Sequence, residues 1–127
     1  MKKVINTKAA PAAIGPYSQA IDTGLGLIFT SGQIPVNLET GEVVEGGIEA
    51  QTEQVFVNLK AVLEASGSSF DQVVKATVFL QDLKDFATVN GIYGKYLGKD
   101  APSRSTVQVA GLPKGSLIEI EVIALNA

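Results

Sequence analysis

One arginine stands in the middle of a short alternating segment, "APSRSTVQV", at residues 101–109. In an extended strand, Val107 and Val109 point to one side, and Arg104, Thr106 and Gln108 point to the other. No acidic residue follows Arg104 within the next ten positions. The segment therefore places a guanidinium, with no acidic residue among the ten that follow it in the sequence, on a strand whose alternation predicts that one face is buried.

Two carboxylates interrupt a second apolar strand, "SLIEIEVIAL", at residues 116–125. Glu119 and Glu121 share one face with apolar residues, and every position of the opposite face from Ile118 to Ala124 is apolar. Carboxylates on an apolar face must be solvated or paired, because burying an unpaired charge is costly. The pattern leaves two structural explanations open: this face meets water here, or Glu119 pairs with Arg104.

Smaller polar groups mark three further places. Ser31 and Gly32, in "FTSGQIP", end a strand where glycine lets a ligand approach the backbone and free N–H groups can bind an anion. An ordinary strand-ending turn has the same composition. Tyr17, in "IGPYSQA", reads equally well as a core aromatic, and Asn90, in "FATVNGIY", as a helix-surface amide.

The composition excludes several classes of chemistry. The 127 residues include no Cys and no His, which excludes a thiolate nucleophile, a zinc cluster and a Ser-His-Asp triad. A net charge of −3 disfavours a nucleic-acid surface, and the acidic residues lack calcium-loop spacing. We expect no metal, no cofactor, no nucleic acid and no membrane partner. Since the N-terminal residues lack the apolar stretch of a signal peptide, a cytoplasmic location is expected.

Hydrophobic periodicity predicts a single α+β domain over residues 1–127. Strands are predicted at 17–22, 27–31, 73–80, 104–109 and 117–125, with "LETGE" as a turn and an optional further strand between the second strand and the first helix. A helix is predicted at 48–66 with Gly67 as its C-cap, and a second helix follows Asp82 or Asp85. Its apolar stripe is Phe86, Val89, Tyr93 and Leu97. Two helices cover only one face of such a sheet, so we expect a homo-oligomer to cover the other.

Five segments together resemble one known family. They are "APAAIGPYSQA", "FTSGQIPVN", "QVFVNLKAVLEASG", "VVKATVFLQDLKDFATVNGIYGKY" and "PSRSTVQVAGLPKGSLIEIEVIAL". In this order they resemble the reactive intermediate deaminase family, and the similarity covers nearly the whole chain. The resemblance implies a chorismate-mutase-like α+β fold, with a mixed sheet of about six strands and two helices on one face. It also implies a homotrimer with a pocket at each subunit interface.

The same resemblance implies residue roles. Arg104 matches the arginine that binds the substrate carboxylate, and Glu119 matches the acid that positions or activates water. Many relatives have Cys where this chain has Thr106, so a thiol is not required here. Arg104, Glu119 and Ser31 are therefore predicted to be catalytic, and Tyr17, Gly32, Asn90, Arg104 and Thr106 to bind substrate.

The implied reaction is hydrolysis of 2-enamine and 2-imine acids, such as 2-aminoacrylate, to 2-keto acids and ammonia. The ligand is then a small imino, enamino or keto acid, and neither metal nor cofactor is needed. One alternative is a trimeric regulator that senses 2-keto acids through the same pocket. A ribonuclease, reported among some relatives, is disfavoured by the acidic composition and the absence of His.

Overall fold

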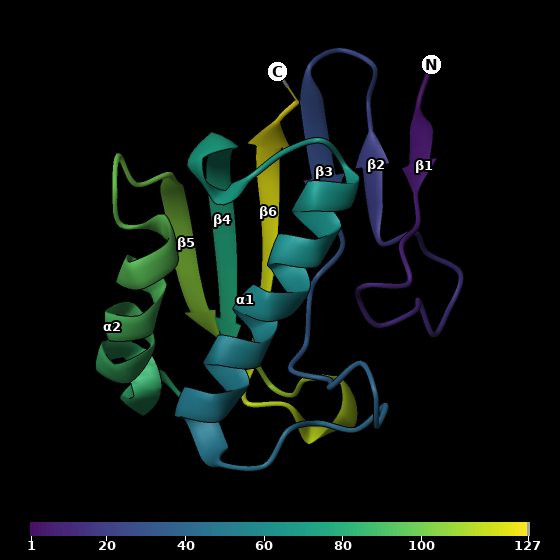
Figure 1. Cartoon of the computed structure of the whole chain (residues 1–127). Helices are drawn as coiled ribbons and strands as arrows, with labels where there is room; N and C mark the ends of the chain where they lie inside the picture. The colour runs from purple at the N-terminus through teal and green to yellow at the C-terminus, as the bar shows by residue number, and fades with distance from the viewer. Residues whose placement is uncertain (127) are drawn as a thin grey trace.

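The computed structural model describes residues 1–126, which form a six-stranded sheet with two long helices against one face (Figure 1). The strands are β1 (Lys3–Ile5), β2 (Ala20–Asp22), β3 (Leu27–Thr30), β4 (Val73–Leu80), β5 (Ser103–Gln108) and β6 (Ile118–Leu125). The helices are α1 (Gly47–Ala65) and α2 (Phe86–Leu97), with short 3-10 turns at Phe70–Gln72, Leu83–Asp85 and Pro113–Gly115. The predicted α+β class and the placement of both helices on one face are confirmed.

The sheet is mixed, with the strand order β1-β2-β3-β6-β4-β5. Only β4 and β5 pair in parallel, and α2 provides the crossover between them. The other neighbours pair antiparallel, so β6 returns between β3 and β4. This order makes β5, which carries Arg104, an edge strand, and it places β6, which carries Glu119, at the centre.

The core lies between the sheet and the helices because alternate strand residues and one stripe of each helix are apolar. Ile118, Ile120 and Val122 of β6 face this layer and are buried. Phe56 of α1 lies at its centre and packs against the ring of Tyr96 with centroids 4.5 Å apart. Burial of these side chains is the main force that joins the helices to the sheet.

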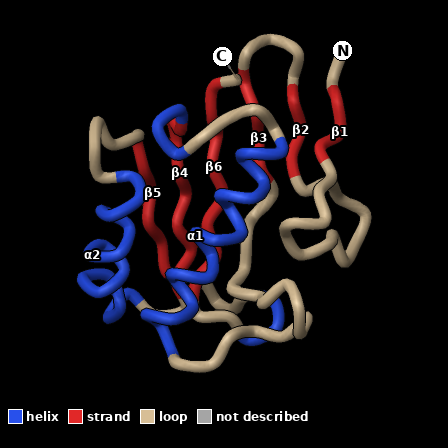
Figure 2. Tube along the Cα trace, viewed as in Figure 1, coloured by secondary structure: helices blue, strands red, loops and turns tan. Residues whose placement is uncertain are grey.

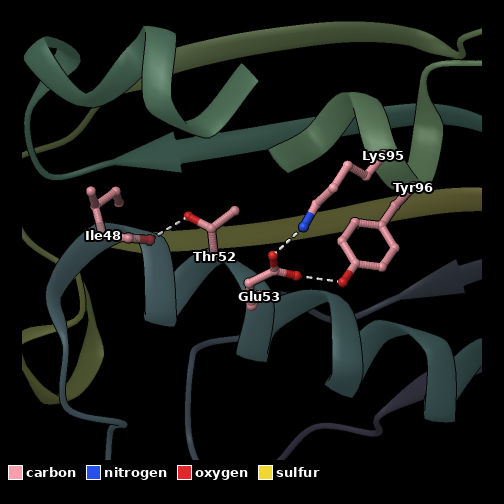
Figure 3. Close-up of polar contacts among 5 residues, drawn as sticks. All are labelled: Ile48, Thr52, Glu53, Lys95 and Tyr96. Atoms are coloured by element: carbon pink, nitrogen blue, oxygen red, sulfur yellow. Dashed lines mark hydrogen bonds and ion pairs between the residues drawn. The ribbon is translucent and has the colours of Figure 1, made fainter. Parts of the chain in front are cut away.

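A polar contact also joins the two helices (Figure 3). The carboxylate of Glu53 in α1 pairs with the ammonium group of Lys95 and accepts a hydrogen bond from the hydroxyl of Tyr96, both in α2. These hydrogen bonds lower the pKa of Glu53, with the hydrogen bond from Lys95 as the largest cause. The contact thus favours the ionised carboxylate.

The opposite face of the sheet carries an uncovered apolar row. Strand register places Val4, Ile21, Phe29 and Ile123 side by side across β1, β2, β3 and β6. Val4 is 56% exposed and Phe29 is 43% exposed, although both belong to a continuous strand surface. Within residues 1–126 nothing packs over this row, as expected from helices that cover a single face.

The observed boundaries correct three sequence predictions. The predicted strand at 17–22 begins only at Ala20, because Tyr17 takes part in a tight turn in which its N–H donates to the Gly15 carbonyl. The optional strand between the second predicted strand and the first helix is only an isolated bridge between Val36 and Val43. The sixth strand is β1 instead, whose three residues are too few to show an alternating pattern.

The ends of the helices follow the predicted signals. Ser66 is the C-cap of α1, and Gly67 directly after it has the left-handed φ of 73° that glycine supplies at the end of a helix. Asp82 accepts a hydrogen bond from the N–H of Lys84 and so caps the 3-10 turn that leads into α2. None of the helices among residues 1–126 is long and apolar enough to cross a membrane.

Candidate functional site

Arg104 lies on the helix-covered side of β5. It pairs in register with Ala76 of β4, which is fully buried beneath the helices. Its Cζ atom lies over the ring of Tyr93, 4.7 Å from the centroid, and 5.6 Å from the centroid of Phe86. Its Nη1 donates to Oδ1 of Asn90 over 2.9 Å. The guanidinium is therefore oriented by two aromatic rings and one amide.

No carboxylate of residues 1–126 pairs with this guanidinium. The ion pairs within residues 1–126 are Lys84–Asp82 and Lys95–Glu53. The suggested pairing of Arg104 with Glu119 is wrong within one chain, because the two residues lie on opposite faces of the sheet. Arg104 is in register with Ala76 and Glu119 with Phe79, and positions three apart on one strand point to opposite sides.

Helix α2 presents the residues that contact Arg104. Phe86, Asn90 and Tyr93 lie at positions i, i+4 and i+7 and therefore share one helix face. Sequence reasoning identified Asn90 but assigned Phe86 and Tyr93 only to the apolar stripe. The signal available in the sequence was the spacing of the two rings around the amide. We call Asn90, Arg104 and Thr106 the arginine cluster.

Thr106 lies two residues beyond Arg104 on the same side of β5, in register with the buried Val78. Its hydroxyl oxygen is buried and has no hydrogen-bond partner. This hydroxyl therefore lies on the helix-covered side of the edge strand, as Arg104 does.

Glu119 lies on the uncovered face of β6, where it packs against Gly32. A Cβ atom built on Gly32 would be 1.9 Å from Oε2 of Glu119, so only glycine permits this approach. Burial raises the pKa of Glu119, and the neighbouring carboxylate of Glu121 raises it further. A carboxyl group in this position gains and loses a proton at a higher pH than an exposed glutamate does.

Tyr17, Ser31 and Gly32 lie outside the regular elements. Figure 2 shows the segment that precedes β2 and the segment that follows β3 as loops. The hydroxyl of Ser31 donates to the carbonyl of Ser18 over 2.5 Å, and its N–H donates to the carbonyl of Gln19. The Tyr17 hydroxyl accepts a hydrogen bond from the N–H of Ile14, and the side chain is 49% exposed. Ser31 thus fixes the loop that carries Tyr17. We call Tyr17, Ser31, Gly32 and Glu119 the glutamate cluster.

A pocket of about 560 Å³ opens beside this cluster, a volume typical of small-molecule sites. Tyr17 and Gly32 line it, together with apolar residues such as Ile14 and Ile34. Lysines are the only charged residues in its wall, although the chain has a net charge of −3. The pocket therefore combines an apolar lining with a local positive charge.

Within one chain the predicted site residues form these two clusters and not a single site. The arginine cluster adjoins α2 on the helix-covered side, and Glu119 lies on the opposite face. The register of β5 and β6 with β4 shows that the two clusters lie on opposite faces. The alternation of residues within each strand does not show it.

A protein-family profile described as "Endoribonuclease L-PSP" matches residues 7–126. A mouse protein named "2-iminobutanoate/2-iminopropanoate deaminase" is 47% identical over 126 residues, which cover 99% of this chain and 93% of that protein. The chain belongs to the reactive intermediate deaminase family.

Other members of the family carry different names. A protein from Lactococcus lactis named "Putative regulator AldR" is 54% identical over 122 residues, 96% of each chain. The crystal structure of Escherichia coli TdcF with bound serine has a TM-score of 0.91 and 46% identity, covering 98% of this chain and 99% of that one. Relatives named as a deaminase and as a regulator thus share about half of this chain's residues, and a structure solved with bound serine shares its fold.

Proposed function

We propose that the chain hydrolyses short 2-imino and 2-enamino acids to 2-keto acids and ammonia. The observation that carries this proposal is Arg104, a half-buried guanidinium that has an amide and two rings as neighbours but no carboxylate partner among residues 1–126. A cation in this state binds an anion favourably, and its planar fork suits a carboxylate. The deaminase name of the mouse relative supports the same reaction.

The complete site lies between copies of the chain in this proposal. The arginine cluster and the glutamate cluster are on opposite sides of one sheet, so a second copy must bring them together. The uncovered apolar row that includes Phe29 and Ile123 favours such an assembly, because covering it removes apolar surface from water. The homotrimer expected from the family resemblance provides three equivalent interfaces of this kind.

Substrate binding begins with the carboxylate. Arg104 donates two parallel hydrogen bonds to it, while Asn90 retains its own hydrogen bond to Nη1. The fixed guanidinium then determines where the imine carbon lies relative to Glu119 of the neighbouring copy. The pocket beside Tyr17 and Gly32 accommodates the substrate side chain.

Glu119 manages the proton transfers. An enamine first gains a proton at C3 and loses one from its nitrogen, which gives the imine with an electrophilic C2 atom. Glu119 in its ionised form accepts a proton from water as its oxygen adds to C2, and donates that proton to the nitrogen, which becomes an amino group. Glu119 then takes the proton of the new hydroxyl and passes it to the amino group as the C–N bond breaks, so that ammonia and the 2-keto acid leave. Water supplies the carbonyl oxygen, and no electrons are exchanged.

A coupled assay tests the proposal. A serine dehydratase generates 2-aminoacrylate, and the decay of its ultraviolet absorbance is followed together with pyruvate release, with and without this protein. We expect decay and keto-acid release to accelerate together in proportion to the amount of protein. Equal rates with and without it, at micromolar concentration, would exclude the reaction.

A second candidate function is regulation through the same pocket, which the name of the Lactococcus lactis relative favours. Arg104 binds the carboxylate of a 2-keto acid equally well in this role. Saturable binding of 2-ketobutyrate by calorimetry, with no acceleration in the coupled assay, would support the regulator and exclude the enzyme.

A further inference from the structure

Two buried hydroxyl groups beside Arg104 have no hydrogen-bond partner. Among the side chains of residues 1–126, Tyr93 Oη and Thr106 Oγ1 are the buried nitrogen or oxygen atoms in this condition. Tyr93 is only 6% exposed and contributes its ring to the surface beneath the guanidinium. Since an unpaired buried hydroxyl costs stability, its occurrence twice around one arginine requires an explanation.

The donors of Arg104 provide that explanation. A guanidinium carries five N–H donors and no acceptor. Asn90 accepts from one donor in this structure, and a carboxylate held by the fork accepts from two more. Two N–H groups are left, and they lose contact with water once a ligand and a second copy cover the site. Tyr93 Oη and Thr106 Oγ1 equal these two donors in number. The ring of Tyr93 contacts the guanidinium, and Thr106 is the next residue on the same side of β5 as Arg104.

We propose that Tyr93 is a positioning residue for Arg104, and that its hydroxyl, together with that of Thr106, accepts hydrogen bonds from the guanidinium when a carboxylate is bound. This inference rests on the proposed function, because it assigns Arg104 to a carboxylate ligand. It differs from a direct contact between Thr106 and substrate, since both hydroxyls act through the arginine.

The state of the Tyr93 hydroxyl fits this role. Burial raises the pKa of Tyr93. Arg104 opposes the increase without reversing it, by its positive charge and as a hydrogen-bond donor close to the hydroxyl, although the two groups do not meet the geometry of a hydrogen bond in this structure. The hydroxyl therefore stays neutral at physiological pH. A neutral acceptor leaves the charge of Arg104 available to the ligand, whereas a phenolate would neutralise it.

The prediction is a loss of binding without a loss of stability. Tyr93→Phe and Thr106→Val remove the hydroxyls and keep the shapes. Since neither hydroxyl is paired in the unliganded protein, the thermal midpoint should stay the same or increase. The dissociation constant for 2-ketobutyrate and KM for 2-aminoacrylate should each increase roughly tenfold for Tyr93→Phe, with kcat nearly unchanged.

Tyr96→Phe is the matched control. Tyr96 belongs to the same helix, but its hydroxyl already donates to the carboxylate of Glu53 in α1 (Figure 3). Its removal should lower the thermal midpoint and leave KM unchanged, the reverse of the Tyr93 result.

A double-mutant cycle tests whether Tyr93 acts through Arg104. Arg104→Lys removes the planar fork. Adding Tyr93→Phe to that variant should therefore cause almost no further loss of 2-ketobutyrate binding. Unchanged KM and dissociation constant in Tyr93→Phe, with wild-type binding intact, would overturn the inference and leave the proposed function standing. A wild-type protein that neither binds the keto acid nor accelerates imine decay would overturn both.

Discussion

The carboxylate of Glu119 lies so close to the Cα atom of Gly32 that a Cβ atom on Gly32 would be 1.9 Å from Oε2. The backbone of Gly32 is not in the left-handed region that favours glycine, so its lack of a side chain, and not its conformation, is what this contact requires. A glycine just beyond the end of β3 and a glutamate of β6, a strand far away in sequence but adjacent in the sheet, thus determine each other's position.

Gly32→Ala should therefore impair turnover more than folding. The clash falls on the far end of a flexible side chain, which can rotate away, so the thermal midpoint should decrease only slightly. The displaced carboxylate of Glu119 is then no longer placed to accept a proton from the attacking water, so kcat should decrease about tenfold or more. Steady-state kinetics and a thermal melt of the same preparation measure both effects.

Gly91→Ala is the control for this substitution. Gly91 lies in α2, and a Cβ atom there meets nothing within 4 Å. Alanine should stabilise the helix by about 0.5–1 kcal/mol and leave kcat unchanged. An equal loss of kcat in both variants would show that the Gly32 effect is not specific to Glu119.

Glu119→Gln should stabilise the protein at neutral pH while slowing hydrolysis. The folded-state pKa of Glu119 is raised, so folding favours its protonated form, and that contribution is lost as the pH rises through the raised pKa. Gln has no charge to bury, and its midpoint should exceed that of wild type at pH 7. The difference should vanish below about pH 4, where Glu119 is protonated in both states. Turnover should decrease about 100-fold, as expected when a general base is removed.

The same raised pKa predicts the activity profile of the wild-type protein. Since Glu119 acts in its ionised form, kcat should decrease as the pH falls through a value above the ordinary glutamate range. If kcat decreased only at the pH at which an exposed glutamate is protonated, or did not decrease in acid at all, Glu119 would have no part in the proton transfers.

Much of this arrangement can be predicted from the sequence, and the remainder depends on register. Period-two alternation correctly separates Glu119 from the buried Ile118 and Ile120. The same alternation in the segment that carries Arg104 does not indicate which of its sides meets the helices. That depends on pairing with β4, a contact between residues nearly thirty positions apart. The sequence likewise does not show that the Tyr93 hydroxyl is unpaired, because Tyr93 falls in the apolar stripe of the second helix, which predicts a core residue.

Arg104→Lys should affect function far more than folding. The partners of Arg104 are an amide and two aromatic rings, so lysine disturbs no ion pair within the chain. It retains the charge but lacks the fork, and losing one charged hydrogen bond should weaken carboxylate binding about tenfold or more. Calorimetry with 2-ketobutyrate and thermal melts distinguish the two effects. Full binding with reduced stability would identify Arg104 as a structural residue.

Glu53→Gln should destabilise the contact between α1 and α2 in a pH-dependent way. Hydrogen bonds from Lys95 and Tyr96 lower the pKa of Glu53, so its contribution is present at neutral pH and is lost as the pH falls through that lowered value. The midpoint of the variant should be modestly lower at pH 7 and should converge with wild type in acid. The control is Glu64→Gln, on the exposed side of the same helix. Its thermal midpoint should equal that of wild type at pH 7 and in acid.

Arg104 and Glu119 must come from different copies if the proposed site is correct, and subunit mixing tests this directly. Arg104→Ala and Glu119→Gln should each be nearly inactive as homo-oligomers. Unfolding the two variants together and refolding them in equal amounts produces mixed oligomers. In a cyclic assembly, roughly a quarter of the interfaces then combine a native Arg104 from one copy with a native Glu119 from the next.

The mixed preparation should therefore recover roughly a quarter of wild-type turnover, because only such interfaces contain both functional groups. The two variants folded separately and then combined serve as the control, and without subunit exchange they should show only the sum of their own activities. Sedimentation or light scattering of the same samples reports the oligomer. If refolded wild type regains full turnover and the refolded mixture does not exceed the control, Arg104 and Glu119 do not act across an interface. A wild-type protein that stays monomeric at micromolar concentration would lead to the same conclusion, since one chain holds these residues on opposite faces of its sheet.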